Sequence, residues 1–195
     1  MHYAAGVLPV AWVDDEAYFL IGRDARDGLW SDFGGKCEKV DRDVASTAAR
    51  EFWEETYGVI MDARAMRARL VPGGCIPLKA RTQNSHPYWC FLVETPWTPH
   101  LRSAFAKQLA FLRGIRQTPS RVYIEKTDIA FVTWHELDTT QAFPKRGVFH
   151  ATIAHHWDTL QAIVDAGPRG WQAACDAAAA TYPLSGADST EAATR

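Results

Sequence analysis

The chain has 195 residues, of which 47% are hydrophobic and 23% are charged, and its formal net charge is −2 at pH 7. A chain of this length and composition can bury an ordinary core within one domain. The near-neutral balance excludes the overall basic excess of a dedicated nucleic-acid-binding protein, although it does not exclude a local basic groove.

The cysteines and the N-terminal residues indicate the cellular environment. Cys37, Cys75, Cys90 and Cys175 are widely separated, which favours reduced, mostly buried thiols over a disulfide framework or a paired metal site. Residues 1–13 have no charged leader before their apolar stretch, unlike a secretory signal. No run approaches the roughly 18 apolar residues of a membrane span. We therefore expect a soluble, cytoplasmic protein with no membrane association.

Apolar runs bounded by polar turns predict the strands. In chain order, these runs are residues 4–13, 17–22, 29–33, 65–71, 88–94, 121–123 and 129–134. The acidic pair Asp14-Asp15 between the first two runs predicts a hairpin. Pro9 favours an edge position or a bulge in the first strand, because proline cannot donate a hydrogen bond to a neighbouring strand.

Apolar residues at helical spacing predict helices between and after these strands. The predicted helices are residues 44–57, 101–116, 148–164 and 171–181. Asp41 or Asp43 can cap the start of the first helix, and Gly58 is suited to end it. Gly167-Pro168 predicts a break between the last two helices.

The order of elements predicts a mixed α/β domain whose sheet is covered by helices. We expect a single domain over residues 1–184, elaborated by helices at about 100–117 and 148–183. Residues 185–195 are small and polar, so we expect them to form a disordered tail.

The first predicted helix carries a cluster of glutamates on one face. Glu51, Glu54 and Glu55 stand at positions i, i+3 and i+4, where like charges repel each other. A solvated acidic surface often has basic partners four residues further on, but Glu54 and Glu55 are followed there by Gly58 and Val59. The cluster therefore indicates a bound cation, and carboxylate oxygens favour a hard divalent ion such as Mg²⁺.

The residues before this helix fit the same chemistry. Gly34-Gly35 allows the backbone to approach a ligand closely, and Lys36 is placed to meet a phosphate. Oxygen ligands beside a cationic side chain suit metal-assisted attack of water on a phosphoanhydride. A carboxylate that is not fully used as a ligand can serve as the general base.

The segment from 35 to 59 resembles the Nudix box of the Nudix hydrolases. That motif is a glycine, five residues, a glutamate, seven residues, Arg-Glu, an aliphatic residue, any residue, Glu-Glu, any residue, a glycine and an aliphatic residue. Residues 50–55 (REFWEE) match its core. Asp41 stands in place of the first glutamate, with eight residues before the core. Thr56-Tyr57 stand where the family has one residue.

The resemblance implies a Nudix-type α/β/α sandwich with a mixed central sheet and additional helices, and a site that uses Mg²⁺ or Mn²⁺. The metal ligands that it implies are the carbonyl of Gly35 and the carboxylates of Glu51, Glu54 and Glu55, one of which can instead activate water. Arg50 would orient these glutamates by ion pairing. Family members often take one more carboxylate from a later loop, for which Glu125 is the first candidate and Asp128 the second.

The resemblance also implies a reaction, namely hydrolysis of a phosphoanhydride in a nucleoside diphosphate linked to another group. Capped RNA and inositol pyrophosphates are alternative substrates within the family, and the box does not choose among them. Lys36 and Arg23 are the candidates for contact with substrate phosphates. The helix at 101–116 fits a substrate lid, a structural cap or a homodimer contact. A Nudix-like nucleotide-binding or sensor module without turnover is the alternative from another class.

Overall fold

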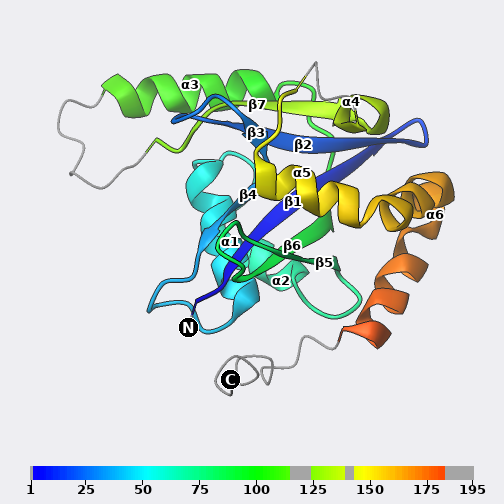
Figure 1. Ribbon diagram of the computed structural model, residues 1–195. Helices are drawn as coiled ribbons and strands as arrows, with labels where there is room; N and C mark the ends of the chain where they lie inside the picture. Colours follow the sequence, from blue (N-terminus) through cyan, green and yellow to red (C-terminus); the bar gives the residue numbers. More distant parts are fainter. Residues whose placement is uncertain (1, 115–123, 139–142, 183–195) are drawn as a thin grey trace.

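The computed structural model describes residues 2–114, 124–138 and 143–182. Within these residues, a mixed sheet has helices on both faces (Figure 1). The strands are β1 (Ala4–Val13), β2 (Glu16–Asp24), β3 (Trp30–Ser31), β4 (Phe33–Lys36), β5 (Ile76–Arg81), β6 (Pro87–Glu94) and β7 (Lys126–Thr133). The helices are α1 (Val44–Glu55), α2 (Ala63–Arg69), α3 (Leu101–Gly114), α4 (Trp134–Asp138), α5 (Gly147–His155) and α6 (Trp157–Thr181). The predicted mixed α/β architecture is confirmed.

Strand β1 is the centre of the sheet. Its first half pairs antiparallel with β4 and its second half antiparallel with β2, while β6 runs parallel along its other edge. Strand β5 extends the sheet beyond β6, and β3 and β7 both pair with β2. Alternate residues of β1 divide the core, because Val7 faces α1, α2 and α3 whereas Leu8 faces α4, α5 and α6.

The predicted edge position of Pro9 is wrong. Successive residues of a strand direct their backbone groups to opposite edges, and the carbonyl of Val10 accepts a bond from the Thr95 N–H on the β6 side. The backbone of Pro9 therefore faces the other edge. There, the pairing with β4 ends at Val7 and the pairing with β2 begins at Val10. A proline is tolerated in this central strand because it lies where the strand changes partner.

One predicted strand is a helix in the structure. Residues 65–71 were expected to be extended, but most of them belong to α2. Asp62 caps this helix by accepting a hydrogen bond of 2.7 Å from the N–H of Ala65. Met66 and Leu70, four residues apart, are its buried contacts. Alanine, arginine and methionine are strong helix formers, so propensity and the cap together outweigh the apolar run.

The other predicted helices form with small changes in their limits. The first ends at Glu55 rather than residue 57, and the third divides at His156 into α5 and α6. Gly167 has a φ of +65° and kinks α6 where the sequence predicts a break. Residues 121–123, 185–195 and the end of the 101–116 helix lie outside the described residues. Within the described residues, no helix is long and apolar enough to cross a membrane.

Strands β1 and β4 approach each other too closely for side chains at two facing glycines. A Cβ on Gly6 would lie 2.7 Å from the carbonyl oxygen of Phe33 and 2.8 Å from the Cα of Gly34. These neighbours are backbone atoms, so they cannot move aside without displacing a strand. The close approach fixes the position of β4, which leads directly into the glutamate-bearing region.

We expect Gly6→Ala to lower the free energy of unfolding by about 1–3 kcal/mol, the usual cost of overpacking a core. Urea denaturation measures this change. Gly114→Ala is the matched control, because no described atom lies within 4 Å of a Cβ at that helical position. The control should be neutral or slightly stabilising. Equal stability of the two variants would contradict the proposed packing limit.

Candidate active site

Helix α1 holds its glutamates against β4. Asp43 caps the helix by accepting a hydrogen bond of 2.7 Å from the Ser46 N–H, and Ala48 and Phe52 pack on the sheet. Glu51 then lies over Gly35, where a Cβ would come within 2.5 Å of its carboxylate oxygen. A side chain at position 35 would displace this carboxylate from its present position. Figure 1 shows α1 beside β4.

Arg50 connects the glutamates to the loop before the helix. Its Nε and Nη2 donate to the two oxygens of Asp41 at 3.0 and 2.9 Å, and Nη2 also donates to the Lys36 carbonyl at 2.9 Å. Its Nη1 donates to Glu51 and Glu54, both at 2.9 Å. Burial raises the pKa of Asp41, but the hydrogen bonds led by Arg50 outweigh it and lower that pKa below its usual value. Asp41 is thus a firmly held, ionised partner of Arg50.

The two inner glutamates are buried and have raised pKa values. Glu51 is 7% exposed and Glu55 is 2% exposed. Burial raises the pKa of Glu51 to about 7, although Arg50 opposes this, and the charges of Glu54 and Glu125 raise it further. Burial likewise raises the pKa of Glu55 to about 8 against the opposing effect of Lys126. A cation added here would be favoured, because it would stabilise both carboxylates in their ionised form.

A buried lysine, Lys126, lies beside Glu55 and partly compensates its negative charge. The Lys126 side chain is 1% exposed, and its Nζ donates to the Ser31 hydroxyl at 2.7 Å and lies 3.3 Å from Oε1 of Glu55. The other oxygen of Glu55 accepts the N–H of Gly34 at 2.8 Å. Both oxygens of Glu55 are therefore fixed in place.

Beside this lysine, Asp32 is buried and accepts a short hydrogen bond from the Tyr88 hydroxyl. Burial raises the pKa of Asp32, while the bond from Tyr88 and the charge of Lys126 oppose that rise. Sequence reasoning missed Lys126, Asp32 and Tyr88. No local pattern distinguishes them from ordinary strand residues, and only the pairing of distant strands brings them together.

The later carboxylates behave differently from each other. Glu125 is exposed at the start of β7, and its charge contributes to the raised pKa values of both Glu51 and Glu55. Asp128 instead binds Arg102 of α3 through two hydrogen bonds, of 2.9 and 2.5 Å. The charge of Glu125 therefore acts on the glutamates of α1, whereas Asp128 is engaged by Arg102.

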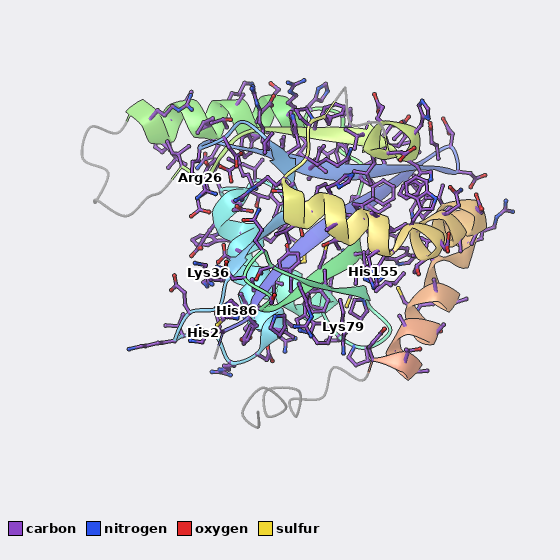
Figure 2. The ribbon with its side chains drawn as sticks, viewed as in Figure 1. His2, Arg26, Lys36, Lys79, His86 and His155 are labelled. Carbon is purple, nitrogen blue, oxygen red and sulfur yellow. The ribbon has the colours of Figure 1, made fainter. Side chains whose placement is uncertain are left out.

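The two predicted phosphate contacts lie at the surface. Lys36 has an exposed side chain, and Figure 2 shows it, like Arg26, on the side of the molecule that carries α1. Arg23 is exposed, but its Nε donates to the carbonyl of Gly28 at 3.1 Å, within its own turn. Lys36 thus stands near the Arg50 network, whereas the described contact of Arg23 is local.

The donor set fits a hard divalent cation. Within the described residues, no three His, Cys, Asp or Glu side chains already converge as a metal site, and Arg50 bridges Glu51 and Glu54 instead. The side chains around this position nevertheless offer carboxylate oxygens, the ligands that Mg²⁺ and Mn²⁺ prefer. Burial raises the pKa of both Glu51 and Glu55 despite the opposing effects of Arg50 and Lys126, so a further cation would favour their ionised forms.

Comparison with solved structures identifies proteins of similar fold. The C. elegans Ap4A hydrolase, solved as a binary complex, aligns with 82% of this chain and 99% of its own at a TM-score of 0.52 and 12% identity. RenU, a Nudix hydrolase from M. smegmatis, aligns with 83% of this chain and 88% of its own at a TM-score of 0.50 and 15% identity. The chain has a Nudix-type fold. The predicted Nudix-type α/β/α sandwich is therefore confirmed.

Sequence comparison adds a local similarity. No protein-family model matches the chain. The chain is 41% identical over 58 residues to an uncharacterized protein of Acanthamoeba polyphaga mimivirus, a match that covers 27% of this chain. The same match covers 19% of the length of that relative. The Nudix-type fold thus rests on structure, and the activity requires its own argument.

The raised pKa values predict how stability depends on pH in metal-free protein. The unfolded chain releases the protons of these glutamates near pH 4.5, whereas the folded chain keeps them to about pH 7 at Glu51 and about pH 8 at Glu55. Their contribution is therefore fully present below pH 4.5 and is lost as the pH rises to about 8. The slope reaches at most about 1.4 kcal/mol per pH unit for each group.

Thermal denaturation in a chelator between pH 5 and pH 8 tests this dependence. Glu51→Gln should flatten the slope relative to the unchanged protein, and Mg²⁺ should recover stability at pH 8. The difference between the two proteins reports the titration of Glu51 together with its effect on Glu55, whose pKa the Glu51 charge raises. Identical slopes would show that Glu51 titrates normally.

Proposed function

We propose that this chain is a Mg²⁺- or Mn²⁺-dependent pyrophosphohydrolase that cleaves the phosphoanhydride of a nucleoside diphosphate linked to another group. The observation that carries the proposal is a set of like-charged carboxylates on α1, which packs against the Gly34-Gly35 backbone of β4. Glu51 and Glu55 are buried there with raised pKa values. A fold gains no stability from burying like charges together, so their value lies in the cation they would bind.

The proposed roles follow from the contacts of each side chain. Glu51, Glu54, Glu55 and Glu125 would hold a divalent cation, which would supply polarisation of a phosphoryl oxygen and a lowered pKa for bound water. Both oxygens of Glu55 are engaged, by Gly34 and Lys126. Glu51 is therefore the better general base, because within the described residues Arg50 engages only its Oε1.

Arg50 would serve as a positioning residue for this base. Its guanidinium binds Glu51 and Glu54 on one side and Asp41 on the other. Lys36 would meet a substrate phosphate, with Arg23 as a second candidate. The C. elegans structure of similar fold is named an Ap4A hydrolase, which supports a nucleotide derivative as the substrate class. Capped RNA stays an alternative substrate.

A nucleotide-binding or sensor module without turnover is the second candidate. It is favoured by one observation, that the described side chains do not already converge as a metal site. Binding of a nucleotide derivative with no product formed, with or without metal, would identify this second function.

The test is turnover of a panel of pyrophosphate compounds, including Ap4A, nucleotide sugars and capped RNA, with Mg²⁺, Mn²⁺ or a chelator. We expect metal-dependent release of a nucleoside monophosphate from at least one compound. Glu51→Gln, Glu54→Gln and Glu55→Gln should each lower kcat about 100-fold or more, as loss of a base or ligand does. Glu16→Gln is the matched control, since Glu16 lies in the exposed β1–β2 hairpin. Turnover that persists in all three variants would refute the assignment.

A further inference from the structure

The segment that follows α1 contains a tyrosine in an uncommon backbone conformation. Tyr57 has a φ of +54°, in the left-handed region, and Gly58 follows with a φ of +68°. Glycine adopts this region at no cost, but a bulky residue there is rare and needs compensating contacts. Tyr57 belongs to the pair of residues that stand where the Nudix box has one. The departure from the motif therefore coincides with a strained position.

Tyr57 makes two contacts that account for this conformation. Its ring stacks on Phe105 of α3, with the ring centres 5.2 Å apart. Its hydroxyl donates a hydrogen bond of 2.7 Å to the carbonyl of Lys126. The first contact is ordinary packing. The second joins the end of the glutamate-bearing helix to the start of β7, 69 residues further along the chain.

The residue beside this bond is the exposed carboxylate Glu125. It precedes the first residue of β7, so strand pairing does not hold it. Its backbone is held on one side by the Ala25 N–H, which donates to the Glu125 carbonyl at 2.7 Å. On the other side, Tyr57 holds the carbonyl of Lys126, and Ser31 holds the Lys126 ammonium. These bonds fix the backbone at Glu125 and Lys126, and with it the direction of the Cα–Cβ bond of Glu125.

We propose that Tyr57 is a positioning residue that holds Glu125 against the glutamates of α1 through its hydrogen bond to the Lys126 carbonyl. This inference rests on the proposed function, because it takes Glu125 as a ligand of the divalent cation. The bond ties the backbone next to Glu125 to a residue just after the end of α1, so the loop keeps a fixed distance from the helix that carries Glu51 and Glu55. Loss of such an outer contact typically weakens metal binding 10- to 100-fold.

Tyr57→Phe separates this role from packing. The substitution keeps the aromatic ring on Phe105 and the same backbone preference, and it removes only the hydroxyl. A packing role alone therefore leaves metal affinity unchanged. The matched control is Tyr18→Phe, which also removes one hydroxyl, in this case from a hydrogen bond of 2.8 Å to the exposed Glu16.

The experiment is a double-mutant cycle on metal affinity in the absence of substrate. Mn²⁺ binding is measured by calorimetry for the unchanged protein, Tyr57→Phe, Glu125→Gln and the double variant, with thermal melts to verify folding. We expect Tyr57→Phe to raise the Kd about 10-fold. In the Glu125→Gln background, the same change should alter the Kd less than about twofold, because the group it positions is absent. Tyr18→Phe should leave the Kd unchanged.

Two outcomes overturn the inference alone. One is Tyr57→Phe binding Mn²⁺ as tightly as the unchanged protein. The other is an equal loss of affinity with and without the Glu125 carboxylate, which would show that Tyr57 acts on the site by another route. If Glu125→Gln abolishes binding, the comparison of Tyr57→Phe with Tyr18→Phe decides the inference. An unchanged protein that does not bind Mn²⁺ would instead refute the proposed function, and this inference with it.

Discussion

The site depends on the close approach of helix α1 to the backbone of β4. The Glu51 carboxylate occupies the space that a side chain on residue 35 would need. This approach removes water from two carboxylates at once, and it is tolerated because Arg50 and Lys126 supply charge from opposite sides. Neither the Arg50 guanidinium nor the Lys126 ammonium is in bulk solvent, so each interacts with its glutamate more strongly than a surface pair would.

This arrangement separates a rigid part of the site from an adjustable part. Glu55 is held at both oxygens by Gly34 and Lys126. Glu54, by contrast, has a side chain that is 46% exposed and meets Arg50 in an i,i+4 contact. Surface pairs of this kind contribute little energy and change partner readily. The cation of the proposed function would therefore meet a loosely held outer glutamate and a fixed inner one.

The features that a sequence reveals best here are the local ones. Glu51, Glu54 and Glu55 lie within five residues on one helix, so their spacing alone predicts a shared face, and the Gly34-Gly35 pair indicates close backbone approach. The Asp41 contact was harder to foresee, because its spacing from Arg50 differs from the family motif. In the structure, the Glu38 N–H and the Thr47 hydroxyl also bind Asp41, and they fix its carboxylate within reach of Arg50.

The residues that sequence reasoning missed are those brought in by distant pairing. Lys126 reads as an ordinary surface lysine until β7 is paired with β2, and Tyr88 and Asp32 meet only because β6 and β4 flank β1. The strand prediction for the α2 region was wrong for a different reason. Its run of alanine, arginine and apolar residues is compatible with a strand or a helix, and the Asp62 cap decides between them.

Lys126 lies far from Glu55 in the sequence, so the order in which the chain folds affects the site. Strand β1, strand β4 and helix α1 all lie within the first 55 residues, and they can associate early through contacts of short sequence separation. Glu55 would then be enclosed without its ammonium partner until β7 arrives, and pairings of such large separation form slowly. A chain that ends before β7 therefore contains every glutamate of the helix without a stable way to bury them.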